Sequence, residues 1–180
     1  MPDALQVLAD DHQEVADLFT QMASTSEPRE RRVIASKIVK ALSQHASVEE
    51  ELFYPAIKDR VADGEGFITT SLQEHAKAKK QLHKLDRMKP GDPLFDPSVG
   101  ELEKEVKEHI ADEEMQLFPR VRAALSAAEL AGLGEQLAGR KAAAPTPPRP
   151  KAASKPPLNV VANRAAAPID HARDANREGV

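Results

Sequence analysis

The chain has no cysteine, no tryptophan and few aromatic residues of any kind. The absence of cysteine excludes disulfides and thiolate metal sites, so any metal ion must be held by histidines and carboxylates. Aromatic residues are 3% of the 180 residues, whereas a β-sandwich core needs aromatic and β-branched residues. The apolar residues are mostly Ala, Leu and Val, which favours packed helices.

Long apolar runs are also missing. No segment approaches the roughly 18 consecutive apolar residues of a membrane span, and the N-terminal segment MPDALQVLADDHQEV does not resemble a secretion signal. We therefore expect a soluble, cytoplasmic protein without a membrane partner. A length of 180 residues with 41% hydrophobic content suits one domain.

Charge and proline content divide the chain near residue 140. Residues 1–140 hold 18 lysines and arginines against 26 acidic residues, whereas residues 141–180 hold 7 against 3, together with 7 of the 14 prolines. We predict one domain over residues 1–140 and a disordered tail rich in Pro, Ala and Lys over 141–180. A solvated linker is favoured over a basic arm because the tail's charge is small, and we expect no nucleic-acid partner.

Helix breakers in the first part predict four long helices and a short fifth one. Ser26 and Asp96 are expected to cap the second and fourth helices, and Ser126 with Glu129 forms a capping box for the fifth. Pro55 is expected to end or kink the second helix. The helices should cover residues 2–22, 29–60, 67–88, 97–124 and 126–139, with boundaries approximate. This pattern predicts an all-α fold, an antiparallel up-down four-helix bundle with a short fifth helix.

Each long helix carries an apolar stripe with spacings of three and four, and each stripe contains one histidine. Two stripes also contain a glutamate four residues after the histidine, so that imidazole and carboxylate face one point. A glutamate among core positions is costly unless it is paired or binds a cation. These residues suit two metal ions, with each glutamate bridging both. The candidate ligands are His12, His45, Glu49, His75, His109 and Glu113.

The chain also repeats itself. His12 and His45 are 33 residues apart and His75 and His109 are 34 apart, and the segments HASVEEELFYP and HIADEEMQLFP share His-x-x-x-Glu-Glu with a proline ten residues after the histidine. Two duplicated helical hairpins would be related by a pseudo-twofold axis. One metal ion would then be held by His12 and His45, and the other by His75 and His109.

The pattern DH, H-x-x-x-EE, EH, H-x-x-x-EE over residues 12–114 resembles the hemerythrin-like HHE cation-binding family of bacteria. The resemblance covers about the first 125 residues. It implies a non-heme di-iron centre with an oxo or hydroxo bridge, the four histidines as terminal ligands, and Glu49 and Glu113 as bridges. Members that bind oxygen reversibly usually carry a further histidine four residues after the third-helix histidine. Lys79 occupies that position here, which argues against oxygen storage.

Two functions need the same ligands. One is an enzyme that acts on a small oxidant such as peroxide or oxygen, catalase-like or peroxide-reducing, in an oxidative-stress response. The other is a sensor or carrier of oxygen, nitric oxide or iron without turnover. A zinc site and a metal-free bundle are the remaining alternatives.

Several conspicuous residues are expected to lie outside the ligand set. Glu50 and Glu114 are placed on a solvated face, with a role behind the ligands left open. Tyr54, nine residues after His45, is placed on the far side of its helix and given no catalytic role. The Lys79 ammonium is expected to reach toward water. His83 and His171 are interpreted as bystanders.

Overall fold

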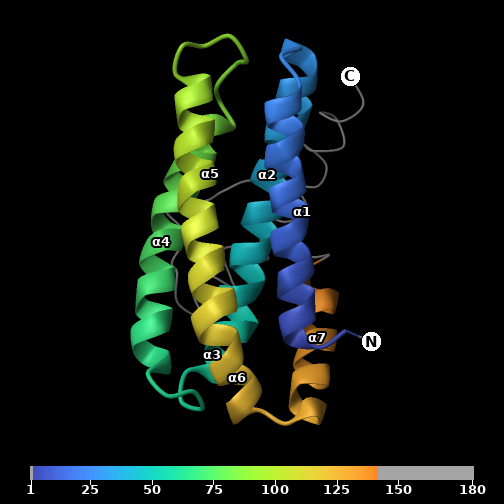
Figure 1. The fold of residues 1–180 in the computed structure, drawn as a ribbon, viewed down its shortest axis with the longest axis vertical. Helices are drawn as coiled ribbons and strands as arrows, with labels where there is room; N and C mark the ends of the chain where they lie inside the picture. Colours follow the sequence, from blue (N-terminus) through green and yellow to red (C-terminus); the bar gives the residue numbers. More distant parts are fainter. Residues whose placement is uncertain (1, 142–180) are drawn as a thin grey trace.

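The chain forms long helices that lie side by side along one axis (Figure 1). The computed structural model describes residues 2–141, and no β-strand occurs within them. The elements are α1 (Ala4–Ser24), α2 (Pro28–Val48), η1 (Glu49–Phe53), α3 (Tyr54–Ile57), α4 (Gly64–Leu85), α5 (Phe95–Asp112), η2 (Glu113–Leu117), α6 (Phe118–Ala124) and α7 (Ala127–Lys141). The predicted all-α fold is confirmed.

Four rods make up the bundle, because α2, η1 and α3 run on without a break, as do α5, η2 and α6. α1 packs against α2 and α4 packs against α5, so each half of the sequence repeat is one antiparallel hairpin (Figure 1). The two hairpins meet where α2 packs against α4. None of the helices in residues 2–141 combines the length and the apolar character that crossing a membrane requires.

The helix starts were predicted with mixed success. The capping box before α7 is confirmed, since Glu129 Oε2 accepts a hydrogen bond from the Ser126 amide at 2.8 Å. The Ser26 and Asp96 caps are wrong, because α2 and α5 have no side-chain cap at all. α5 begins one residue before Asp96, at Phe95, whose ring is 1% exposed in the core. Burial of that ring, rather than capping, sets the start of the helix.

The buried apolar residues form two clusters at opposite ends of the bundle. One cluster surrounds Leu8, Phe53 and Leu117 at the end of the bundle that contains α3 and α6. The other surrounds Ile38 and Leu102 toward the opposite end. The buried histidines and glutamates occupy the layer between them. The polar layer is therefore sealed above and below by hydrophobic core.

Each of the two longer rods contains one π-helical turn. The Tyr54 amide bonds to the Glu49 carbonyl and the Phe118 amide to the Glu113 carbonyl, both five residues back. A proline follows immediately in each rod, at Pro55 and at position 119, and cannot donate the next helical bond. The two π-turns occupy equivalent places in the sequence repeat. They give structural support to the predicted duplication.

The π-turns change which side chains face inward. The predicted stripes hold as far as Glu49 and Glu113 and then fail, since each turn adds one residue and rotates the next part of the helix by about 100°. Ala56 and Arg120, which an unbroken α-helix would place on the same inward stripes as His45 and His109, are exposed. The buried positions are instead Tyr54, Ile57, Leu117, Phe118 and Val121.

The fifth helix packs along α1 and α2 (Figure 1). It continues through Lys141, one residue beyond the predicted domain boundary. Gly134 makes the close approach possible, because a Cβ atom there would lie 2.6 Å from the Pro2 carbonyl oxygen and 2.8 Å from the Asp3 carbonyl carbon. The predicted disordered tail lies outside the described residues and stays a prediction.

Gly134→Ala should destabilise the protein, because the new methyl group meets backbone that cannot turn aside. We expect the free energy of unfolding to fall by about 1–3 kcal/mol, measured by urea denaturation followed by circular dichroism. Gly132→Ala is the matched control, since nothing lies within 4 Å of a Cβ atom there. It should be neutral or stabilising by up to about 1 kcal/mol. Equal effects of the two substitutions would contradict the close packing of α7.

Candidate metal centre

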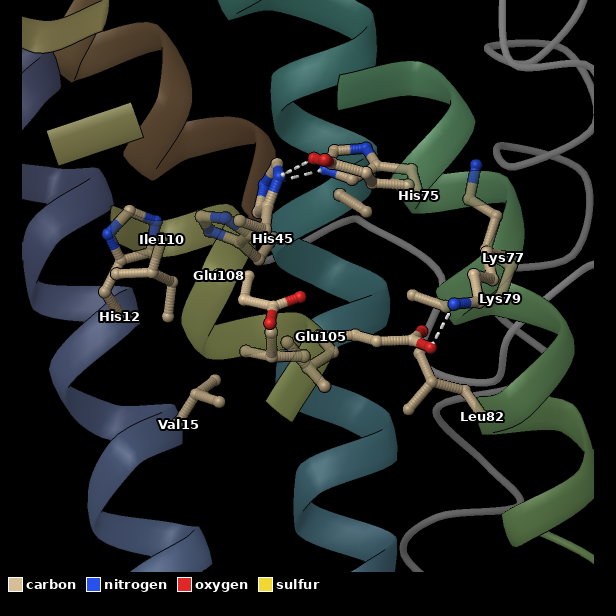
Figure 2. Close-up of a pocket in the computed structure, with 16 residues that line it drawn as sticks. His12, Val15, His45, His75, Lys77, Lys79, Leu82, Glu105, Glu108 and Ile110 are labelled. Carbon is tan, nitrogen blue, oxygen red and sulfur yellow. Dashed lines mark hydrogen bonds and ion pairs between the residues drawn. The ribbon is translucent and has the colours of Figure 1, made fainter. Parts of the chain in front are cut away.

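The four predicted histidines meet at one level of the bundle, one from each of α1, α2, α4 and α5. All four are buried, with exposed fractions between 4% and 8%. Figure 2 shows His12, His45 and His75 turned toward the same interior space. The rings lie in two edge-to-face pairs, His12 with His45 and His75 with His109, each with 4.8 Å between ring centroids. This is the pairing expected from the sequence repeat.

Glu49 and Glu113 lie between the two histidine pairs. Glu49 Oε2 is 3.1 Å from His45 Nε2 and 3.3 Å from His75 Nε2. Glu113 Oε2 is 3.4 Å from His12 Nε2 and 3.7 Å from His109 Nε2. Each carboxylate thus touches one imidazole of each pair, which is the arrangement of a bridging ligand.

The inner atoms of this layer fit a cation. Within residues 2–141, the buried His12 Nε2, His45 Nε2, Glu113 Oε2 and both carboxylate oxygens of Glu49 have no hydrogen-bond partner. Such atoms are rarely left unsatisfied in a folded protein. Two groups of potential ligand atoms come close enough to hold an ion each. They are His12, His45, Glu49 and Glu113, and Glu49, His75 and His109, with the atoms of each group within 4.8 Å of one another.

Burial and the neighbouring carboxylates act in opposite directions on these imidazoles. Burial alone would lower the pKa of His45, but Glu49 and the other nearby carboxylates outweigh it and raise that pKa to about 10. Burial would also lower the pKa of His75, but hydrogen bonds to Glu49 and Glu50 and the charges of these carboxylates outweigh it and raise that pKa to about 9. Protons on these rings compete with a metal ion for the same nitrogen atoms.

A second carboxylate stands behind each histidine. Nδ1 of His12 is 2.7 Å from Glu114, and Nδ1 of His75 is 3.0 Å from Glu50. Both glutamates were predicted to lie on a solvated face, and this is wrong for Glu50, which is 1% exposed. Glu114 is half-exposed but still reaches His12. The alternative role behind the ligands is the one that the geometry supports.

The other two histidines have corresponding partners. His109 Nδ1 is 2.8 Å from Glu74 Oε2, and His45 Nδ1 is 3.6 Å from Asp11 Oδ2. Asp11 and Glu74 each precede a histidine of the repeat, as Glu50 and Glu114 each follow a candidate bridging glutamate. A carboxylate at Nδ1 holds the proton there and leaves the Nε2 lone pair free for a metal ion.

Two lysines compensate the buried charge of these outer carboxylates. Lys79 Nζ is 2.7 Å from both oxygens of Glu50, with only 13% of the lysine side chain exposed. The prediction that Lys79 reaches toward water is therefore wrong, because a buried carboxylate lies within its reach. Lys141, at the end of α7, donates to Asp11. The fifth helix thereby contacts the group behind His45.

Sequence reasoning missed Tyr54, in addition to the roles of Asp11, Glu74 and Lys79. The Tyr54 hydroxyl donates to Glu113 Oε1 at 2.8 Å and lies 3.4 Å from His75 Nε2. The prediction that it faces away assumed an unbroken α-helix, in which nine residues make two and a half turns and place Tyr54 opposite His45. The π-turn brings it back to the inner face. Burial, and next the charge of Glu113, raise the pKa of Tyr54 well above its ordinary value. The sequence signal for the inward position of Tyr54 was the proline that recurs six residues after each candidate bridging glutamate, because this proline follows both π-turns.

Of the remaining histidines, His83 is the one that lies within residues 2–141, and it does not join the centre. His83 is exposed on α4 and contacts Arg87, and His171 lies outside the described residues. The expectation for His83 as a bystander is confirmed by its position.

The sequence is similar to a known family of cation-binding domains and to individual proteins. The sequence model of the hemerythrin HHE cation binding domain matches residues 3–121. An uncharacterized hemerythrin-like protein of Schizosaccharomyces pombe is 28% identical over 165 residues, which is 91% of this chain and 81% of that protein. A DNA nickase of Nostoc sp. is 32% identical over 120 residues, covering 67% of this chain but only 34% of the nickase.

A solved structure shares the fold. The crystal structure of a hemerythrin HHE cation binding domain-containing protein from Mycobacterium kansasii superposes with a TM-score of 0.69 at 24% identity, covering 79% of this chain and 86% of that one. The family match spans both His-x-x-x-Glu motifs and both hairpins of the bundle. The chain belongs to the hemerythrin HHE cation-binding domain family.

Proposed function

We propose that this protein binds two iron ions in the polar layer of its bundle and uses them to disproportionate hydrogen peroxide. The observation that supports this is the sharing of Glu49 and Glu113 between the two histidine pairs. Each ion would have two histidines and the two shared carboxylates, a nitrogen and oxygen donor set that suits non-heme iron and leaves positions open for a small molecule.

When bound, the iron pair would supply a redox couple through which electrons pass from one peroxide molecule to another. Disproportionation needs no external reductant, because one peroxide molecule gives up the two electrons that another accepts. The peroxide that is reduced takes up two protons and leaves as two water molecules. The one that is oxidised releases two protons and leaves as oxygen. The chain must therefore hold and return protons close to the metal ions.

Tyr54 is suited to that task. Its buried Oη carries a proton, since its pKa is raised by burial, and it donates that proton toward Glu113 inside the centre. The outer carboxylates orient the imidazoles, and Lys79 and Lys141 balance their charge. The two hydrophobic clusters exclude bulk water from the layer.

Metal analysis tests the centre directly. The purified full-length protein should hold about two irons per chain, because the inward donors are too many for one tetrahedral ion. Glu49→Gln and Glu113→Gln should each lose most of the iron, since a shared carboxylate serves both ions. His83→Ala, an exposed histidine on α4, is the control and should keep full iron content. Full iron in both glutamine variants, or one zinc in the wild type, would refute the assignment.

The outer carboxylates allow a graded test. Glu114→Gln keeps a hydrogen-bonding group beside His12 Nδ1 but removes its charge. We expect iron affinity to fall by about 10–100-fold, measured by competition with a chelator. Glu103→Gln, on α5 and paired with the exposed Lys107, should leave affinity unchanged. Identical affinities in the two variants would show that Glu114 has no part in holding His12.

Tyr54→Phe tests the proton donor. If the hydroxyl delivers a proton, peroxide consumption should fall by about 100-fold or more, while iron content stays near that of the wild type. The variant keeps the ring that packs among Phe53 and His75. Unchanged peroxide consumption at unchanged iron content would remove Tyr54 from the reaction.

A sensor without turnover is the second candidate, and the contacts of α7 favour it. Lys141 bonds to Asp11 behind His45, and Arg140 forms two bonds, of 2.8 and 3.1 Å, to the buried Glu51 of the η1 π-turn. A change in the centre that moves His45 or η1 would therefore alter the contacts of Arg140 and Lys141 at the end of α7.

State-dependent proteolysis tests this second candidate. Trypsin cleaves after arginine and lysine, and Arg140 and Lys141 are held by their ion pairs with Glu51 and Asp11. A sensor should show cleavage rates at these two residues that differ several-fold between the oxidised and reduced iron-loaded protein. Arg29, at the start of α2 and exposed, provides the reference site. Equal rates in both states would argue for the enzyme alone.

A further inference from the structure

Helix α7 ends in two basic residues, and each forms an ion pair with a buried carboxylate of the bundle. Lys141 Nζ donates to Asp11 Oδ1 on α1. Arg140 donates from Nε and Nη2 to the two oxygens of Glu51 on η1, at 2.8 and 3.1 Å. A bidentate pair of this kind is strong and has a fixed geometry. The end of α7 is therefore fixed against the α1–α2 hairpin (Figure 1).

Asp11 connects this helix end to one candidate metal position, the one formed by His12 and His45. It precedes His12 in the chain, and its Oδ2 atom lies 3.6 Å from His45 Nδ1. Lys141 holds the other carboxylate oxygen of Asp11, so that Oδ2 stays directed at the imidazole. A group behind a ligating histidine orients its ring, and the loss of such a group typically lowers metal affinity by about 10–100-fold. Lys141 is thereby connected to His45 through Asp11.

Asp11 depends on this lysine because its carboxylate is buried. Only 7% of the Asp11 side chain is exposed, whereas the side chain of Glu74, its counterpart in the sequence repeat, is 39% exposed and can be hydrated. A buried carboxylate without a cation or a full set of hydrogen bonds is costly. If Lys141 were replaced by an uncharged residue, Asp11 would turn toward water and leave His45 Nδ1 without that carboxylate.

The other candidate metal position, formed by His75 and His109, has a lysine within the four rods of the bundle. Lys79 Nζ is 2.7 Å from both oxygens of Glu50, and Glu50 Oε1 is 3.0 Å from His75 Nδ1. Lys79 lies one turn after His75 on α4, and Glu50 lies on η1. These contacts include no residue of α7. Each metal position thus has one buried carboxylate that is paired with a lysine.

The sequence repeat explains why the His12–His45 position uses a lysine from α7. Ala16 of α1 corresponds to Lys79 of α4, since each lies four residues after the histidine of its helix. An alanine carries no charge and cannot pair with a carboxylate. Within residues 2–141, Lys141 is the lysine that forms an ion pair with Asp11. The fifth helix therefore supplies the cation that α1 lacks.

We propose that Lys141 is a positioning residue for one of the two metal ions. By holding Asp11 behind His45, it stabilises an ion at the His12–His45 position, whereas the His75–His109 position is stabilised by Lys79 within the four rods. Removal of the Lys141–Asp11 contact would leave a centre that holds one ion tightly instead of two. The proposal rests on the pair of metal ions in the proposed function and is independent of the reaction with peroxide.

Cobalt(II) binding to the metal-free full-length protein tests this role, measured by calorimetry and by the absorbance of the bound ions. Lys141→Met should weaken one of the two bound ions by about 10–100-fold and leave the other nearly unchanged. Lys141→Arg keeps the charge and should restore most of the lost affinity. Arg122→Met removes an exposed arginine that pairs with Asp3 away from the centre, and this matched control should change the affinity of neither ion.

Substitution of the histidines identifies the affected ion. In the Lys141→Met variant, His109→Ala should remove the remaining tight ion, whereas His12→Ala should leave it in place. In a Lys79→Met variant the pattern should be reversed, with His12→Ala removing the remaining tight ion. Circular dichroism melts of the metal-free variants check that each one is folded.

The possible outcomes separate this proposal from the proposed function. Equal weakening of both ions in Lys141→Met, or no weakening of either, would overturn the positioning role. A wild-type protein that holds a single cobalt ion would overturn both the positioning role and the two-ion centre. The expected selective weakening, together with an iron-loaded wild type that does not consume peroxide, would support the positioning role and remove the proposed reaction.

Discussion

The structure depends on two buried carboxylates that are shared between four imidazoles. Glu49 and Glu113 are 0% and 2% exposed, and each contacts a histidine from both hairpins. Two carboxylates in such a layer are costly unless cations or protons balance them. The contacts therefore join α1, α2, α4 and α5 at one level, and a pair of metal ions would replace protons there. Every other feature of the site either orients these groups or shields them from water.

Duplication explains how ten ionisable groups come to be arranged so regularly. In each hairpin a carboxylate precedes the first histidine, and a glutamate follows the His-x-x-x-Glu motif of the second helix. Each of these outer carboxylates then serves a histidine, either in its own hairpin or in the other one. The repeated π-turns are part of the same arrangement, because they let the chain carry the motif and still return apolar residues to the core below it.

The fifth helix breaks this symmetry. It covers only the α1–α2 side, where Arg140 engages Glu51 and Lys141 engages Asp11. The residue that corresponds to Glu51 in the other hairpin is Met115, and it is 78% exposed. The two candidate metal positions thus have different surroundings, although their inner ligands are equivalent. The position near His12 and His45 lies beside α7, whereas the position near His75 and His109 lies between α4 and α5.

The sequence by itself determined the helical class, the duplication and the six inward residues, because helical periodicity and i, i+4 spacing are local properties that tertiary contacts did not override as far as Glu49 and Glu113. Tertiary structure decided the rest. Tyr54 enters the centre only because a π-turn rotates it inward, Glu50 is buried only because Lys79 and His75 neutralise it, and α5 starts at Phe95 because its ring fills the core. These outcomes depend on partners distant in the chain, and a local pattern carries no information about which partner a side chain will meet.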